Sequence, residues 1–116
     1  MLTIVFSSLL FLSDGDANQM VSMCRNVNEV HVTHQDNLNL RECYGWVLGV
    51  AEVLNNEVFM SGDNDQQCIP VGVSQRQLAR IFLKYVEEHP KLLRLPRAYV
   101  IKIALIDAFQ CVSQDH

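Results

Sequence analysis

Apolar residues recur at intervals of three and four along most of this chain, which is the spacing of one face of an α-helix. The clearest stripe lies in QRQLARIFLKYVEEH and comprises Leu78, Ile81, Phe82, Tyr85 and Val86. Ser74 precedes it and Gln77 stands three residues later, a capping box in which each side chain bonds a backbone N–H of the other residue. Pro90 then ends the stripe. The pattern predicts a helix between Ser74 and Pro90.

Three further helices are expected from the same periodicity. The first covers about Asn18 to Asn26, and the second covers about Leu40 to Asn55 with the stripe Tyr44, Val47, Leu48, Ala51 and Leu54. The last starts near Pro96 and has the stripe Val100, Ile101, Ala104, Leu105 and Ala108. The polar segments NVNEVHVTHQDNLN and NNEVFMSGDNDQQ are predicted to be loops. These elements predict an all-α fold, a small bundle of four or five helices held by disulfides.

The second predicted helix contains two glycines and the chain's single tryptophan. Gly45 and Gly49 are four residues apart, and glycine costs a helix about 1 kcal/mol relative to alanine. We therefore expect another backbone to pack closely against them. Trp46 lies off the apolar stripe, so it either marks an interface, where tryptophan is enriched, or is partly buried by the N-terminal segment.

The N-terminal segment resembles a secretory signal peptide. An uncharged apolar run extends from Met1 to Leu12, which is too short to span a bilayer. Gly15 and Ala17 place small residues at the −3 and −1 positions of a cleavage site. We predict a signal peptide over residues 1–17, a single domain over 18–116 and a periplasmic protein without membrane attachment after cleavage. No Lys or Arg precedes the run, and the alternative is the first helix of a cytosolic interaction domain.

The four cysteines follow this segment and their number is even, which in an oxidising compartment predicts two disulfides. Four cysteines allow three pairings. In an antiparallel hairpin the start of one helix lies near the end of the other. Cys68 lies just before the predicted helix between Ser74 and Pro90, and Cys111 lies at the end of the last predicted helix. These two cysteines are therefore expected to form a disulfide. Cys24–Cys43 follows by elimination.

Charge and motifs argue against several classes of function. The net charge is −4 and no basic cluster is present, which disfavours nucleic-acid binding. No phosphate-binding loop, nucleophile elbow or helical His-Glu-x-x-His is present, so we expect no enzyme and no cofactor. His31 and His34, with Cys24 and Cys43 on either side, allow an alternative Cys2His2 zinc site. Disulfide formation in an exported protein argues against it, and no metal is expected.

Spaced motifs between Cys43 and Cys111 are similar to those of the small periplasmic immunity proteins of type VI secretion, the resistance-associated and Tai-like group. The first motif comprises Cys43, Gly45, Trp46 and Gly49. The second comprises Cys68, Pro70, Gly72, Val73 and Ser74, and the third comprises Lys84, Tyr85, His89 and Pro90. The last comprises Ala104, Leu105, Ala108, Phe109 and Cys111, with Gln110 where proline is usual.

This resemblance implies a homodimeric, non-catalytic protein that binds a peptidoglycan amidase effector, covers its active-site cleft and protects the producing cell. Binding is expected on a protruding polar loop, with Trp46 as a further contact. The loop residues expected to reach the effector are Ser61, Asp63, Asn64 and Asp65. The alternatives are a small helical stress chaperone of the periplasm, activated by acid, and an exported binding protein of another kind.

Overall fold

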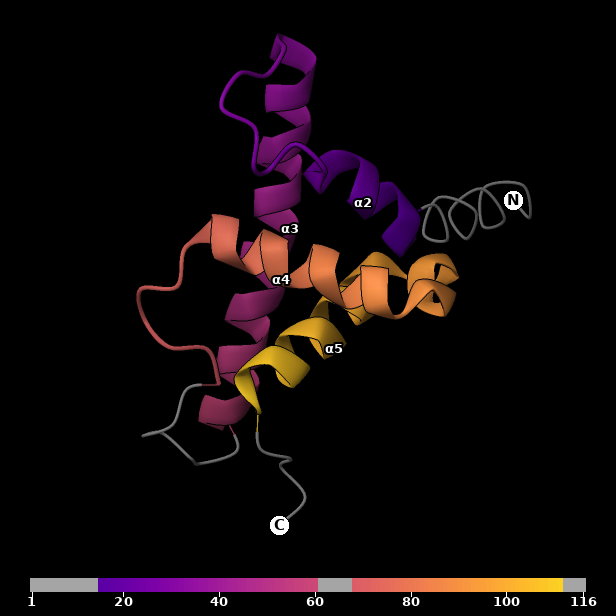
Figure 1. The fold of residues 1–116 in the computed structure, drawn as a ribbon. Coiled ribbons are helices and arrows are strands. Elements are labelled where there is room, and N and C mark those ends of the chain that lie inside the picture. Colours follow the sequence, from indigo (N-terminus) through magenta and orange to yellow (C-terminus); the bar gives the residue numbers. More distant parts are fainter. Residues whose placement is uncertain (1–14, 61–67, 112–116) are drawn as a thin grey trace, which may run out of the picture.

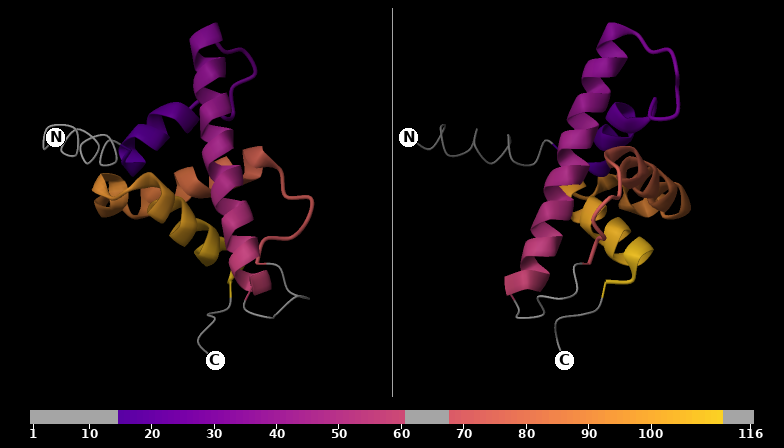
Figure 2. Two further views of the ribbon diagram at one scale, coloured as in Figure 1. Left: turned by 180° about the vertical axis from the view of Figure 1, so that it is seen from behind. Right: turned by 90° about the vertical axis from the view of Figure 1, so that its left-hand side faces the viewer.

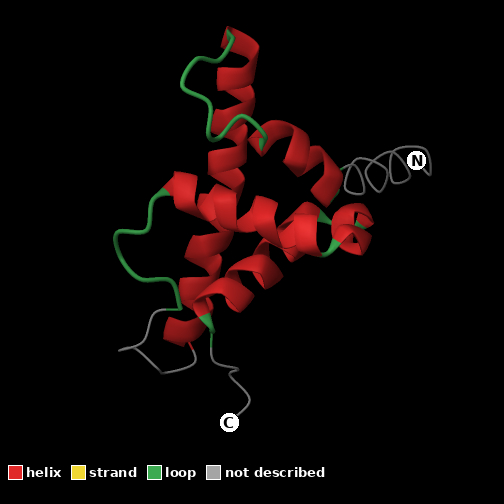
Figure 3. Ribbon diagram, in the orientation of Figure 1, coloured by secondary structure: helices red, strands yellow, loops and turns green. Residues whose placement is uncertain are grey.

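The computed structural model describes residues 15–60 and 68–111. The elements in these ranges are α2 (Ala17–Cys24), α3 (His34–Met60), α4 (Gln75–Glu88), the 3₁₀ helix η1 (Pro90–Arg94) and α5 (Arg97–Phe109), shown in Figure 1. Figure 3 shows helices and loops but no strand in the described part of the chain. The predicted all-α class and the four helices are therefore confirmed.

Helix α3 is the longest element, with 27 residues, which corresponds to about 40 Å at 1.5 Å per residue. Helices α2, α4 and α5 all contact it. The right-hand view of Figure 2 shows that these three helices lie on the same side of α3. The opposite side of α3 is not covered by any other described helix. One long helix therefore contributes both to the core and to an open surface.

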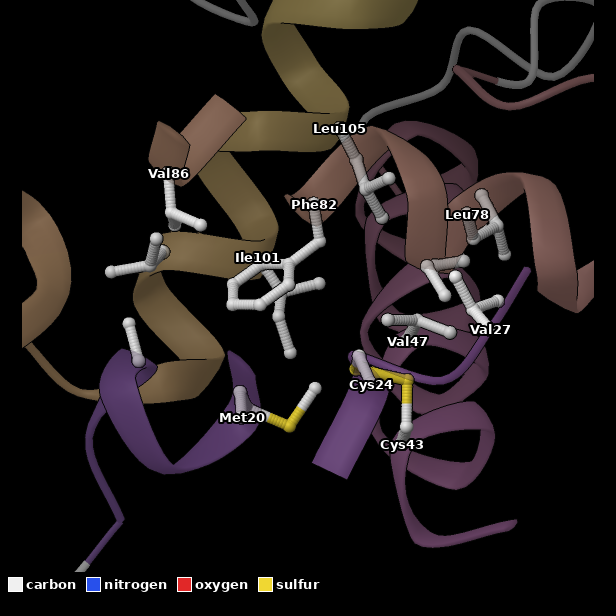
Figure 4. Close-up of a cluster of buried hydrophobic side chains, with 14 of the residues drawn as sticks. Met20, Cys24, Val27, Cys43, Val47, Leu78, Phe82, Val86, Ile101 and Leu105 are labelled. Carbon is white, nitrogen blue, oxygen red and sulfur yellow. A yellow bond between two sulfur atoms is a disulfide. The ribbon is translucent and has the colours of Figure 1, made fainter. Parts of the chain in front are cut away.

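The core is formed where the four helices meet. Every buried residue in the described ranges is hydrophobic. Figure 4 shows Phe82 of α4 among Met20 of α2 and Ile101 and Leu105 of α5, and all four side chains are fully buried. The capping box predicted for α4 is present, with Ser74 N–H donating to Gln77 Oε1 at 2.9 Å and Gln77 N–H donating to Ser74 Oγ at 3.1 Å.

Two disulfides join the pairs that the hairpin argument predicts. Cys24–Cys43 connects the end of α2 to α3 with a Cα–Cα distance of 5.2 Å. Cys68–Cys111 connects the segment before α4 to the residue that follows the C-cap of α5, with a Cα–Cα distance of 5.1 Å. Each disulfide contributes about 3–4 kcal/mol in the chain-entropy account, because it restricts the unfolded chain.

The buried face of α3 differs from the predicted stripe. The buried residues of this helix are Leu40, Cys43, Val47, Ala51 and Leu54. Leu48 is 37% exposed and Tyr44 is only half-buried, although both were expected to face the core. Bonding to Cys24 holds Cys43 inward, and the helix is rotated accordingly.

Helix α3 is also longer than predicted at both ends. The expected loop between the first two helices includes residues 34–39, which are helical in the structure. Thr33 is the reason, because its Oγ1 accepts the Asp36 N–H at 3.1 Å, a bond typical of a helix N-cap. The first turns show no apolar stripe because they are mostly exposed. At the other end α3 continues to Met60 instead of stopping at Asn55.

The segment before α4 is tied to α3 by a side-chain amide. Ile69 N–H donates to Asn55 Oδ1 at 2.9 Å, and Asn55 Nδ2 donates to the Ile69 carbonyl at 3.2 Å. Ile69 is buried, and it adjoins Cys68 of the second disulfide. This pair of bonds and the disulfide hold the same part of the loop in place.

We predict that Asn55→Ala lowers the free energy of unfolding by about 1–3 kcal/mol, because the Ile69 N–H and carbonyl lose their partner in a partly buried site. Asn56→Ala is the matched control, since Asn56 is exposed on the next position of the same helix. Urea denaturation followed by circular dichroism measures both. Equal midpoints for the two variants would contradict the assigned role of Asn55.

Candidate functional site

A surface hollow of about 690 Å³, here called the groove, lies between the exposed flank of α3 and the first turns of α5. Its lining residues are Glu42, Gly45, Trp46, Gly49, Val50, Val53, Leu54, Ala98, Tyr99 and Lys102. Helix α3 supplies one wall of the groove. Because its buried face carries Cys43 and Val47, the flank that carries the two glycines faces solvent. Hollows of this size are typical of sites that receive a ligand or a segment of a partner.

Gly45 and Gly49 leave open space in the groove, and no neighbouring backbone packs against them. A Cβ atom built on Gly45 or Gly49 would meet no atom within 4 Å outside its own helix and chain neighbours. The prediction of a close backbone at this position is therefore wrong. Both glycines are exposed and line the groove beside residues of α5. Within the described fold, no packing contact accounts for glycine at these positions.

Trp46 is half-buried and forms part of the wall of the groove. The guanidinium carbon of Arg97 lies 4.2 Å from the centre of a Trp46 ring, a cation–π contact. Arg97 in turn lies against Gly15, where a Cβ atom would collide with its guanidinium group. Trp46 is thus partly exposed and contacts Arg97 of α5, and its place in an interface stays a prediction.

Two large side chains of the groove remain open to solvent. Val53 is 54% exposed and Tyr99 is 52% exposed. An aromatic residue beside aliphatic residues and glycines suits a protein interface, where tyrosine and tryptophan often contribute most of the binding energy. Glu42 and Lys102 add one charge of each sign to the lining. The composition of the groove suits binding.

The other predicted site residues either lie outside the described part of the chain or are held in a disulfide. The polar residues expected to contact an effector lie in the segment 61–67, outside the described residues: Ser61, Asp63, Asn64 and Asp65. Cys24 and Cys43 are bonded to each other, so they are not thiolate ligands for a zinc ion with His31 and His34. Tyr99 and Val53 were not predicted as site residues. The only signal for them in the sequence is that each is a large apolar or aromatic residue outside the predicted apolar stripes.

The described residues lack the features of a membrane span and of a metal-binding cluster. Among the described residues, no helix has the length and apolar character needed to cross a bilayer. The same ranges hold no group of three or more His, Cys, Asp or Glu side chains arranged as ligands for a metal ion.

The family of the protein follows from a comparison of the whole chain with family models. A model described as Rap1a immunity proteins matches residues 16–111. The chain belongs to the Rap1a immunity protein family. Neither a search of the curated proteins nor a search of the solved structures found a match. The Rap1a match includes all four cysteines and both walls of the groove.

We predict that Gly45→Ala and Gly49→Ala each raise the free energy of unfolding of this Rap1a protein by about 0.5–1 kcal/mol. Alanine is the better helix former, and the space at both positions is open. Gly72→Ala is the control and should lower stability, because Gly72 has a φ angle of +99° that favours glycine. Urea midpoints measure all three variants. A loss of stability in the helix variants would show that the groove is not open.

Proposed function

We propose that this Rap1a protein is a periplasmic immunity protein that binds a type VI secretion peptidoglycan amidase effector and covers its active-site cleft. Membership of an immunity family supports the binding of a toxin, and the resemblance of the motifs supports an amidase as that toxin. Two disulfides suit an exported protein, because they persist in oxidising compartments. Family membership also favours this proposal over the stress-chaperone alternative.

The observation that carries the proposal in structural terms is the open groove. The floor of the groove is made of two glycines that lower helix stability without a packing contact in the described fold, and Tyr99 protrudes beside them. Such an arrangement suits an apolar projection of the effector, which would cover Val53 and Tyr99. The segment 61–67 directly follows α3, so we assign its polar residues to the amidase cleft and the groove to the surface beside that cleft.

A homodimer is also part of the proposal, as the resemblance implies. A second copy of the chain competes with the effector as the occupant of the groove. The two occupants differ in a measurable way, because a dimer contact is present without effector and an effector contact is not.

The proposal predicts that co-expression in the periplasm prevents lysis by the cognate amidase, and that the two proteins elute together on gel filtration. Val53→Glu should weaken the complex at least tenfold, because the new charge would be buried without a partner. Val30→Glu is the matched control, since Val30 is 87% exposed in the loop between α2 and α3. Continued lysis with the unaltered protein, and no complex, would reject the function.

The same variants identify the occupant of the groove. If Val53→Glu leaves the oligomeric state of the free protein unchanged and weakens only the complex, the groove is the effector contact. If it converts a free dimer to monomers, the groove is the dimer contact and our assignment to the effector is wrong. Light scattering of each free protein, with Val30→Glu alongside, gives this result.

The segment 61–67 makes a separate prediction. Replacing Asp63, Asn64 and Asp65 together by alanine should reduce inhibition of the amidase, because the carboxylate and amide groups would no longer bond the catalytic side chains. Unfolding midpoints should be unchanged. Inhibition measured on purified peptidoglycan tests this, and full inhibition by the triple variant would remove the segment from the binding site.

A further inference from the structure

Residues 15–17, here called the N-terminal strap, are an integral part of the folded domain. Ala17 N–H donates to the Leu95 carbonyl and Arg97 N–H donates to the Gly15 carbonyl, both at 2.9 Å. The Asp16 carboxylate accepts the Gln19 N–H at 2.9 Å and so caps α2. Ala17 is fully buried. The strap therefore starts α2 and joins it to the beginning of α5.

The sequence offers two positions for removal of a signal peptide. Signal peptidase requires small residues at −3 and −1, and between Ser13 and Ala17 two pairs satisfy this requirement. Ser13 with Gly15 places the cut before Asp16, whereas Gly15 with Ala17 places it before Asn18. The sequence pattern above was assigned to the second pair, and the two cuts have different consequences for the fold.

A cut before Asn18 would remove every contact of the strap. Helix α2 would lose its Asp16 cap, and the N–H groups of its first turn would lose that partner. The core would lose Ala17, and the Leu95 carbonyl would lose its donor. Helix α2 has only 8 residues, so the loss of its first residue and cap affects a large part of it.

A cut before Asp16 would remove much less. The cap, the buried Ala17 and its bond to Leu95 all remain. Only the bond from Arg97 N–H to the Gly15 carbonyl is lost. That N–H belongs to the first turn of α5, where helix N–H groups have no partner within the helix and can be satisfied by water.

We infer that export processing of this protein cuts between Gly15 and Asp16, so that the mature chain keeps Asp16 and Ala17. The inference rests on the export that the proposed function includes, and it revises the cleavage after Ala17 that the sequence pattern suggested. The match to the Rap1a family begins at residue 16, which is the first residue that this cut retains.

The test is to express the full chain in a Gram-negative host and to determine the N-terminal residue and intact mass of the periplasmic product. We expect a chain that begins at Asp16 and is four hydrogen atoms lighter than its reduced form, because it holds two disulfides. A periplasmic chain beginning at Asn18 would overturn the inference while leaving export intact. An uncleaved cytosolic chain would overturn the export itself.

A pair of variants tests the position of the cut before folding matters. In pulse-labelled cells, Ala17→Gln should be processed at the normal rate, because it changes only the second residue of the mature chain. Gly15→Gln should accumulate as precursor, because it places a large residue at −1. Accumulation of the Ala17→Gln precursor would show that the cut follows Ala17.

Chains that begin at the two candidate residues give an independent measurement. The chain from Asn18 should melt at a lower temperature than the chain from Asp16, and the fluorescence of Trp46, the only tryptophan, should shift to the red. This shift is expected because Arg97, which covers the Trp46 ring, adjoins the bridge between Asp16 and Pro96. Identical melting and emission would contradict the inference.

Discussion

The structure depends first on how α3 is rotated about its own axis, and the Cys24–Cys43 disulfide is the covalent constraint on that rotation. A domain of this size buries a modest core, so a covalent bond between α2 and α3 has a large influence on the packing. With Cys43 held inward, Val47, Ala51 and Leu54 follow on the same face. The three other helices then pack on that side (Figure 2).

The same rotation creates the groove. Once the cysteine face is buried, Gly45 and Gly49 lie on the exposed flank, where their missing side chains leave a hollow beside Tyr99. Two helix-weakening residues on a surface without packing contacts are typical of a site at which stability is given up for function. Trp46 joins this surface to the fold through its contact with Arg97.

The ends of the elements are held by a few polar bonds to distant segments. Asn55 near the end of α3 bonds both backbone groups of Ile69. At the other end of the fold, residues 15–17 bond residues 95–97. Because the core contains only hydrophobic residues in the described ranges, these bonds, together with the disulfides, fix where each segment enters and leaves it.

The sequence by itself determined the all-α class and the capping box at Ser74, because helix periodicity and caps are local properties. It left three possible cysteine pairings, of which the structure has the one that the hairpin argument favoured. It did not determine the start of α3, since the helix signal there is one Thr33 bond followed by exposed polar turns. Only the tertiary structure decided that Gly45 and Gly49 face open space with Tyr99 beside them. That outcome depends on the rotation of α3 and the placement of α5, which are set by contacts between segments far apart in the chain.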